Sequence, residues 1–416
     1  MPDYKRKVEQ QFDSVVILAP FPWQQVWQST HYIADYLSKR LPVLYVEPPP
    51  MWFPNSDLFS TSRLIQMLSA GRLRRRSIGM NVLVPRSAPF GRSPRMRAWI
   101  DRLYARDVLQ ASKRLRFQRP LYWTFNDSIR KMETSTMVEH FVYQCLDLYR
   151  DTEEERETTR RATVVFAVSN ALCQKHQPLN SKCFLVPNGI DTALFRSRSR
   201  DHYERPADLP AGKPMIGYAG TISAHNDLTL LERVARAFPF ADVVLVGPLR
   251  KGDWGPQGKQ KMALDALRML PNVHLLGERS VLQLPDYLQS FDVCVVASLV
   301  DEWSRHADPL KFLQYLAMEK PTVAMRMPSF EPYASLCYLA DSPESFVKQV
   351  ERALSEVPYE KIARRRRAAV STRSWDAIIG KACQILKEQG CILPEPVTSH
   401  RAAGSTDGTR RASARF

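Results

Sequence analysis

The sequence lacks an apolar run long enough to cross a membrane. A transmembrane helix needs roughly 20 consecutive apolar residues, and no run in the 416-residue chain approaches that length. The opening segment, MPDYKRKVEQQFD, is hydrophilic and has no apolar core of the kind that a secretory signal peptide requires. We therefore expect a cytoplasmic protein.

The chain also lacks the cysteine pairs that disulfide frameworks and zinc sites use. It has seven cysteines, an odd number, and none of them form a Cys-x-x-Cys pair. Cys145 and Cys294 lie in apolar, strand-like runs, where a free cysteine usually serves as a small buried residue. We expect no metal site and no cofactor.

Acidic residues are scarce in one segment of a chain whose net charge is +16. Residues 61–119 contain fifteen Arg or Lys against two Asp. Charge of one sign that is so concentrated indicates a partner. Apolar residues recur in the same segment at the three- and four-residue spacing of a helix: Ile100, Tyr104, Val108, Ala111 and Leu115.

A basic amphipathic surface without a spanning helix suits reversible docking on anionic lipid. We therefore expect residues 61–119 to contact an anionic membrane, which would place the protein at the inner face of the cell membrane. A solvated helix face is the alternative. We expect no nucleic-acid partner, because no DNA- or RNA-binding motif accompanies the charge and the aromatics do not form stacking platforms.

Strand-like and helix-like segments alternate along the chain, which is long enough for two domains. Such alternation predicts α/β domains with doubly wound parallel sheets. The predicted strands cover residues 14–19, 41–49, 120–125, 140–149, 163–169, 214–223, 241–248, 272–277, 291–298 and 321–325. The predicted helices cover roughly residues 28–40, 94–116, 151–162, 258–269, 281–290, 343–356 and 359–388.

The stretch 301–321, DEWSRHADPLKFLQYLAMEKP, lies between two of these strands. It predicts a polar loop followed by a helix with Asp308 as N-cap and Pro309 at the first helical position. The helix would then start at the carboxyl edge of a sheet, where open α/β folds bind ligands.

Two cations lie at this helix start, which already carries partial positive charge and free N–H groups. Arg305 precedes the helix and Lys311 lies in its first turn, where a carboxylate would suit folding better. An anion such as a nucleotide pyrophosphate would explain both residues. The alternative is that both side chains are simply solvated, with Asp308 offsetting their charge.

The stretch resembles the nucleotide-sugar loop of a branch of the GT-B glycosyltransferases, the family-4-like "glycosyltransferase family 1" proteins of bacterial polysaccharide synthesis. Their pattern runs approximately N-E-L-T-R-A-V-S-P-L-K-L-Y-E-Y-L-A-A-G-K-P. The matching residues are Glu302, Arg305, Pro309, Leu310, Lys311, Tyr315, Leu316, Ala317, Lys320 and Pro321. Gln314 replaces the glutamate that holds the ribose hydroxyls in that family.

Weaker similarity extends over most of residues 14–388 and is strong again over 182–195. Val-Pro-Asn-Gly-Ile-Asp (186–191), followed by Phe195, resembles the turn that ends the family's first domain. Tyr143, Cys145 and Asp147 match a "V-Y-x-C-x-D-D" segment, although Leu148 replaces its second acid. The segment around Trp27 to Glu47 resembles the family's first loop and second strand, with Ser29 and Thr30 in place of the usual Arg and Pro.

The resemblance implies a GT-B fold, in which two Rossmann-like domains face each other across a cleft. The boundaries it suggests are 1–200 for the first domain, 201–212 for a linker, 213–372 for the nucleotide-sugar domain, 373–390 for a helix crossing back to the first domain, and 391–416 for a disordered basic tail. It also implies retaining transfer of a sugar from a nucleotide-diphosphate donor to a hydroxyl of a glycan or lipid-linked acceptor.

The resemblance assigns residues to both substrates. The donor-binding residues would be Gly220, Gly277, Glu302, Arg305, Lys311 and Gln314. Asp147 and His31 would face the acceptor as catalytic residues. From its position alone, Asp147 could equally cap the following helix, and His31 could be a surface residue of a first helical turn.

Two other functions stay open. A GT-B fold can house epimerases or phosphorylases, although neither a general-acid constellation nor a cofactor lysine stands out. The departures at Ser29, Leu148 and Gln314 could instead mark a degenerate domain that binds nucleotide or glycan without catalysis. Retained hydrolysis of a sugar donor would argue against that degenerate domain.

Overall fold

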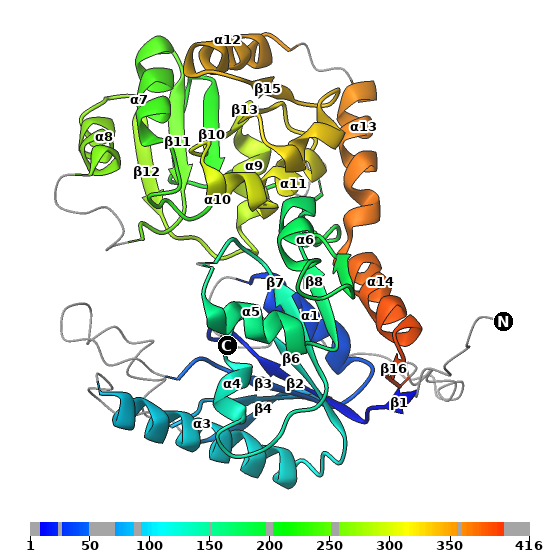
Figure 1. The fold of residues 1–416 in the computed structure, drawn as a ribbon. Coiled ribbons are helices and arrows are strands. Elements are labelled where there is room, and N and C mark those ends of the chain that lie inside the picture. The colour runs from blue at the N-terminus through cyan, green and yellow to red at the C-terminus, as the bar shows by residue number, and fades with distance from the viewer. Residues whose placement is uncertain are drawn as a thin grey trace, which may run out of the picture.

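The computed structural model describes residues 9–23, 27–49, 71–86, 93–149, 151–196, 203–250, 258–356 and 360–394. Two sheets, each covered by helices, form two lobes that lie one above the other in Figure 1. The lower lobe is built from the first half of the chain together with residues 375–392, and the upper lobe from the rest of the second half.

The sheet of the first lobe has the order β4-β5-β3-β2-β6-β7-β8-β9. Its neighbouring strands pair in parallel, apart from β4 with β5. The strands are β2 (Ser14–Leu18), β3 (Val43–Val46), β4 (Leu73–Ser77), β5 (Met80–Leu83), β6 (Pro120–Thr124), β7 (Phe141–Cys145), β8 (Val164–Ala167) and β9 (Cys183–Leu185). The helices are α1 (Ser29–Ser38), α3 (Pro94–Arg114), α4 (Ile129–Met132), α5 (Glu153–Arg161) and α6 (Asn170–His176).

The sheet of the second lobe has the order β12-β11-β10-β13-β14-β15 and is parallel throughout these strands. Its strands are β10 (Met215–Ala219), β11 (Asp242–Val246), β12 (Val273–Gly277), β13 (Val293–Val296), β14 (Thr322–Met325) and β15 (Tyr338–Ala340). Its helices are α7 (Leu228–Ala237), α8 (Lys259–Arg268), α9 (Leu284–Ser290), α10 (Glu302–His306), α11 (Leu310–Ala317) and α12 (Pro343–Leu354), with a 3₁₀ helix, η2, over Pro328–Tyr333.

The central strands are buried on both faces, which explains their nearly continuous apolar sequences. In β2 and β10, every residue is buried. Runs rich in Val, Ile and Leu are typical of parallel sheets whose two faces are both covered by helices. The strand–helix alternation therefore predicted the doubly wound sheets correctly.

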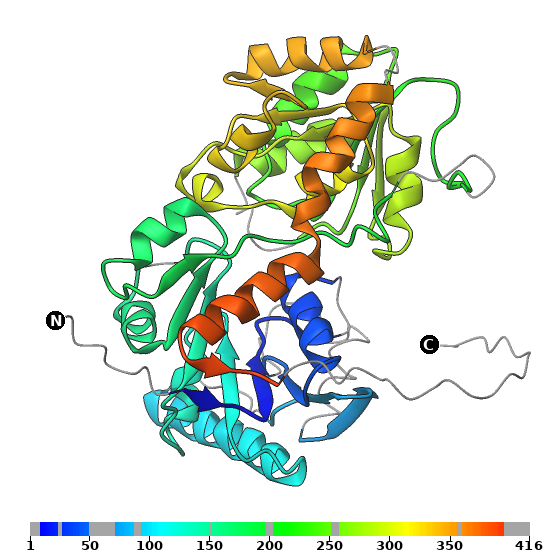
Figure 2. The ribbon, with the colours of Figure 1, turned by 90° about the vertical axis from the view of Figure 1, so that its right-hand side faces the viewer.

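The long helix expected over 359–388 is broken in the structure. It consists of α13 (Glu360–Val370), a 3₁₀ turn, η3 (Ser371–Arg373), and α14 (Trp375–Glu388). Ser374 caps α14 and pairs with Ile190 in an isolated bridge, which holds the chain extended at the break. In Figure 2, helix α13 runs along the second lobe and helix α14 along the first lobe. Helix α14 buries Trp375 and Ile379 in the core around the first sheet.

The final described residues form a strand, contrary to the expected tail from residue 391. The strand β16 (Cys391–Ile392) pairs in parallel with β1 (Gln10–Gln11), so the chain remains ordered to the end of the described part. The remainder of the expected tail, 395–416, lies outside the described residues. No helix in the described ranges is long and apolar enough to span a bilayer.

Candidate active site

The carboxyl ends of the two sheets face each other at the junction of the lobes. The chain leaves β9 through Asn188, whose backbone N–H donates to Asp308 Oδ2 at 2.8 Å in the loop after β13. The Asn188 side chain accepts from Ser29 Oγ, at the start of α1, at 2.6 Å. Helices α10 and α6 also contact each other across the junction (Figure 1). Residues at these strand ends are therefore placed to act on one bound ligand.

In the second sheet, the three adjacent strands β10, β11 and β12 end at glycines. Gly220 and Gly247 have φ values of +151° and +148°, in the region that favours glycine. A Cβ at Gly247 would lie 1.9 Å from the carbonyl oxygen of Gly220, so no side chain fits there. Gly277 has a φ of +74° and its carbonyl accepts from the Gly247 N–H at 2.8 Å. The N–H groups of Gly220 and Gly247 are bonded within the sheet, but the lack of side chains lets a ligand approach this edge closely.

Lys311 lies directly over this glycine edge. Its Nζ donates to the hydroxyl of Tyr218 and lies 4.5 Å from the centroid of that ring. A Cβ at Gly220 would come within 3.0 Å of Lys311 Cε and 3.2 Å of its Nζ. The absence of a side chain at Gly220 therefore makes the room that the lysine occupies.

The helix that carries Lys311 is tied to the strand beneath it. The Tyr315 hydroxyl donates to the carbonyl oxygen of Ala219 at 3.1 Å and accepts from the Ala219 N–H at 2.8 Å. Burial raises the pKa of Tyr315 well above its ordinary value, so this hydroxyl stays protonated. The position of α11 relative to Gly220 is thereby fixed.

The expected start of this helix was wrong. Helix α11 begins at Leu310 after Pro309, and Asp308 does not cap it. Asp308 is buried and accepts from the Asn188 N–H and from Arg373 Nη2, the latter at 2.6 Å. These partners come from distant parts of the chain and outcompete local capping.

The expected polar loop before it also contains a helix, α10. Asp301 caps α10 and accepts from the Ser304 N–H at 2.8 Å, while Ser304 Oγ accepts from the Asp301 N–H at 2.9 Å. This reciprocal capping stabilises a single helical turn. As a result, Glu302 and Arg305 are presented on a helix, both with exposed side chains.

Two polar side chains on α10 and α11 are not used within the described part of the chain. Neither Arg305 nor Gln314 has a side-chain hydrogen bond or ion pair among the described residues. Gln314 lies three residues after Lys311, so the two share one face of α11. Two cations and a free amide near the start of a helix can bind a phosphorylated ligand.

Asp147 follows β7 on the opposite side of the junction. Burial raises the pKa of its half-buried carboxyl to about 6, and the positive charge of Arg250 in the second lobe opposes that shift. An acidic group with such a perturbed pKa is typical of a functional site. The alternative that Asp147 caps the following helix is wrong, because Thr152 caps α5.

His31 is buried rather than on the surface, so the surface alternative is wrong. Its Nδ1 accepts from the Gln28 N–H at 3.0 Å, which leaves Nε2 to donate to the carbonyl oxygen of Pro22 at 3.1 Å. Trp23, Trp27 and Tyr45 surround the ring, and burial lowers its pKa. Both nitrogens of a neutral imidazole are therefore engaged in holding the first loop.

Sequence reasoning missed three residues that the structure brings to this junction. Gly247 completes the glycine edge. The feature of the sequence that could have revealed it is the Gly-Pro pair at the end of the predicted strand 241–248. Asn188 and Arg373 join the loop before α11 to the first lobe, since Arg373 donates to both the Asn188 carbonyl oxygen and Asp308. The Val-Pro-Asn-Gly turn was noticed, but its partners could not be found from spacing.

Solved structures with this arrangement define the class of fold. A sucrose-phosphate synthase from Thermosynechococcus elongatus is 14% identical, with a TM-score of 0.69 over 90% of this chain and 98% of that chain. Anabaena HepE, solved in complex with UDP and glucose, is 15% identical, with a TM-score of 0.62 over 90% of this chain and 99% of that chain. At such identities the likeness concerns the fold, and the fold is GT-B.

The sequence of the second lobe is similar to a known family. Residues 213–356 match the family described as "Glycosyl transferases group 1". The matched segment contains Gly220, Gly277, Glu302, Arg305, Lys311 and Gln314.

A curated relative supports the same family. The protein TuaH of Bacillus subtilis (strain 168), a glycosyltransferase named for teichuronic acid biosynthesis, is 25% identical over 214 residues. That alignment covers 50% of this chain, and the chain spans about half (51%) of the length of the relative.

Proposed function

We propose that this protein is a retaining glycosyltransferase. It moves a sugar from a nucleoside-diphosphate donor to a hydroxyl of a glycan or lipid-linked acceptor in cell-surface polysaccharide synthesis. The observation that carries the proposal is Lys311 fixed over the glycine edge of a group 1 domain, beside the unpaired Arg305 and Gln314. TuaH, named for teichuronic acid biosynthesis, supports the choice of pathway.

The donor lies along the second sheet in this proposal. Its diphosphate occupies the space over Gly220, where Lys311 and Arg305 stabilise the negative charge that develops as the sugar leaves. Gln314 hydrogen-bonds the ribose hydroxyls, Gly277 lets the base approach the end of β12, and Glu302 binds the sugar. Side chains stabilise the charge of the leaving diphosphate. The nucleotide sugar is a co-substrate rather than a cofactor.

The acceptor lies along the first sheet. Asp147 is mostly ionised at neutral pH, since the pKa of its carboxyl is about 6, and the carboxylate accepts a hydrogen bond from the attacking hydroxyl. His31 acts on the same side through the loop that it holds, because both of its nitrogens are already bonded to that loop. His31 is therefore a positioning residue in this scheme.

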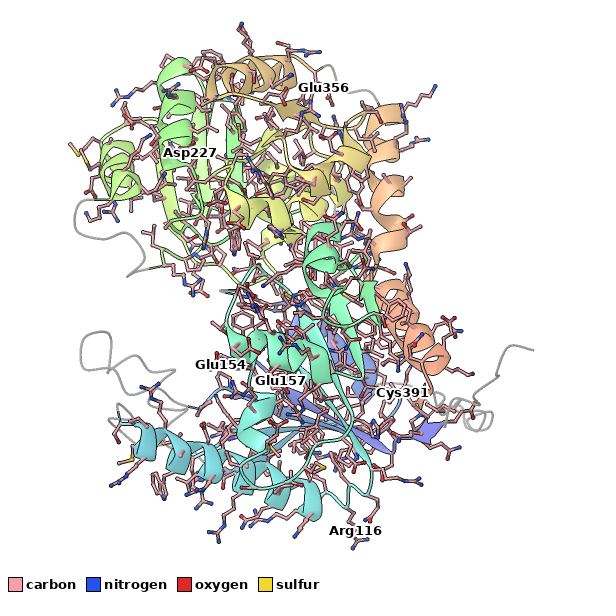
Figure 3. The ribbon with its side chains drawn as sticks, viewed as in Figure 1. Arg116, Glu154, Glu157, Asp227, Glu356 and Cys391 are labelled. Carbon is pink, nitrogen blue, oxygen red and sulfur yellow. The ribbon has the colours of Figure 1, made fainter. Side chains whose placement is uncertain are left out.

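A basic surface on the first lobe supports membrane docking. Edge strand β4 carries Arg75 and Arg76, and exposed Ile78 and Trp99 lie among the cations of β4 and α3. Arg116, just after α3, lies at the end of the first lobe farthest from the second in Figure 3. We propose that this surface holds the enzyme peripherally at the inner face of the cell membrane, near a lipid-linked acceptor. Residues 61–70 and 87–92 of the expected basic segment lie outside the described residues.

The experiment that tests the function measures nucleoside diphosphate release from a panel of nucleotide sugars, with and without acceptor glycans. The proposal expects slow donor hydrolysis, faster release with a suitable acceptor, and an α-linked product from an α-linked donor by NMR. Nucleotide binding without any release would support the degenerate binding domain instead. An inverted product would contradict the retaining mechanism.

A further inference from the structure

A buried cluster of metal-ligating side chains lies behind Asp147, outside the proposed donor and acceptor sites. Cys145 at the end of β7, Glu155 on α5 and His176 on α6 are all buried. Within the described part of the chain, their ligand atoms form the group of three that could hold a metal ion, and these atoms all lie within 4.8 Å of one another. Three elements of the first lobe therefore converge on one point.

The hydrogen bonds around His176 fix which of its nitrogens is free. Thr159 Oγ1 donates its proton to the carbonyl oxygen of Glu155 at 2.9 Å, so it can only accept from His176 Nδ1, which lies 3.0 Å away. Nδ1 therefore carries the ring proton, and Nε2 has a bare lone pair. Nε2 is buried and has no hydrogen-bond partner. A buried polar atom without a partner is rare in folded proteins, and a bound ion is one of its explanations.

The group nearest to that lone pair is a carboxylate. Glu155 Oε1 lies 3.7 Å from His176 Nε2, while Lys175 Nζ donates to the other oxygen, Oε2, at 2.6 Å. Burial and the charge of Lys175 lower the pKa of His176 to about 4, so the imidazole is neutral at physiological pH. Two lone pairs thus face each other without a proton between them, an arrangement that a cation would stabilise.

We propose that Cys145 Sγ, Glu155 Oε1 and His176 Nε2 bind one zinc ion. Thiolate, imidazole and carboxylate together suit zinc among the common metals, and zinc prefers tetrahedral coordination. Tetrahedral bonds of about 2.0–2.2 Å to nitrogen and oxygen place these two atoms about 3.3–3.5 Å apart, and the separation of Nε2 and Oε1 without the ion is slightly larger, 3.7 Å. The Tyr143 hydroxyl, which donates to Glu155 Oε1 at 3.2 Å, is a further oxygen beside the site.

Binding requires the loss of one proton. Burial raises the pKa of the Cys145 thiol to about 12 in the empty site, and the thiol donates to the carbonyl oxygen of Asp147 at 3.2 Å. A zinc–sulfur bond would replace the S–H bond and release that proton to solvent, since a coordinating thiol is deprotonated by the metal. The site then becomes tighter as the pH rises.

The zinc would be structural. It would cross-link the end of β7 to α5 and α6, and so fix the chain that leads from Cys145 to Asp147. No step of the proposed transfer uses the ion, so the site is independent of the proposed reaction. Its spacing of nine and twenty intervening residues resembles none of the short motifs by which zinc sites are recognised, so the site could not be found from sequence spacing.

The first test is elemental analysis of the full-length protein after zinc loading and removal of free metal. We expect about one zinc per chain in the wild type and a loss of bound zinc in Cys145→Ser and His176→Ala. Cys294→Ser is the matched control, because Cys294 is equally buried but lies in β13; it should keep the metal. Zinc in the wild type that remains in Cys145→Ser would overturn the assignment.

The second test does not depend on the folding of a variant. Cobalt(II) added to the metal-free wild type should produce the thiolate-to-cobalt charge-transfer absorption and the intense visible bands of a tetrahedral site, and zinc should displace them. A wild type that binds no zinc and gives only the weak spectrum of octahedral cobalt would overturn the proposal.

Discussion

The two edges that face each other at the junction differ in how their polar groups are used. On the edge of the second sheet, Arg305 and Gln314 have no partners among the described residues, and the strands end at glycines. On the edge of the first sheet, Ser29 and both nitrogens of His31 are engaged in internal hydrogen bonds. The second edge therefore keeps polar side chains available to a ligand, whereas the first uses these groups to hold its own loops.

This difference indicates where a binding function resides. Arg305 has no partner among the described residues and so stabilises nothing there, which makes a ligand the simplest reason for its placement. Satisfied buried groups stabilise the fold itself. Asp147 is the exception on the first edge. Burial raises the pKa of its carboxyl, and the positive charge that opposes this shift, Arg250, belongs to the other lobe.

The largest expected effect comes from removing Arg373, which joins the Asn188 carbonyl oxygen to the Asp308 carboxylate. Arg373→Ala would leave the Asp308 carboxylate buried without its guanidinium partner, which in proteins costs about 3–5 kcal/mol of stability. We expect a correspondingly lower free energy of unfolding by chemical denaturation. Arg365→Ala, on exposed α13 surface, is the control. Equal stability of the two variants would show that the Arg373–Asp308 ion pair does not stabilise the fold.

The next largest effect is expected from removing Lys311, the central cation of the proposed donor site on the second sheet. Lys311→Ala should lower kcat by roughly 100- to 1,000-fold, as the loss of one group that stabilises transition-state charge does. The measurement is nucleoside diphosphate release at saturating donor. Lys348→Ala, an exposed lysine on α12, should retain the wild-type rate. If both variants retained it, the donor would not lie at Lys311.

A smaller effect concerns the pH dependence of the acceptor edge. Activity should rise with pH through about 6, where Asp147 loses its proton and becomes a hydrogen-bond acceptor. Asp147→Asn should be about tenfold slower at neutral pH, the loss expected for one hydrogen bond to a charged group, and should lack this step in the pH–rate profile. A step that persists in the variant would belong to another group.

Asp147 should also influence stability. Its folded pKa lies above the value of 3.8 for a free carboxyl, so the folded state holds the proton more tightly and loses stability as the pH rises from about 4 to about 6. Asp147→Asn should therefore melt higher than the wild type at pH 8. A lower melting temperature would indicate that the carboxylate is needed for folding.

Gln314→Glu tests the proposed donor site by adding a negative charge there. A carboxylate accepts stronger hydrogen bonds from ribose hydroxyls than an amide does, and Lys311 on the same helix face would stabilise it. We expect the donor Kd to fall about fivefold, equivalent to about 1 kcal/mol, by calorimetry. Weaker binding would mean that Gln314 donates, rather than accepts, a hydrogen bond.

The smallest effect lies on the basic surface of the first lobe. Arg102→Gln removes one exposed cation from α3, and each cation contributes about 1 kcal/mol near an anionic membrane. Partitioning into phosphatidylglycerol-containing vesicles should fall about fivefold, with no change in phosphatidylcholine vesicles. Equal binding of wild type to both lipids would favour a merely solvated helix face.

The sequence predicted the fold better than it predicted individual contacts. Strand runs and the cations Arg305 and Lys311 are local features, so they could be recognised without the structure. The role of Asp308 could not, because its partners Asn188 and Arg373 lie 120 and 65 residues away in the chain. Local capping rules cannot anticipate such partners, and the same holds for the convergence of Cys145, Glu155 and His176.

The most direct test of the donor edge is a thermal-shift screen against UDP, GDP, dTDP, ADP and CMP and their sugars, with Lys311→Ala beside the wild type. At a ligand concentration of 100 times Kd, binding adds about 2.7 kcal/mol of stability, which raises the melting temperature measurably. We predict that one nucleoside diphosphate and its sugars stabilise the wild type and that Lys311→Ala loses the shift. No shift with any nucleotide, or an equal shift in the variant, would contradict a donor site at Lys311.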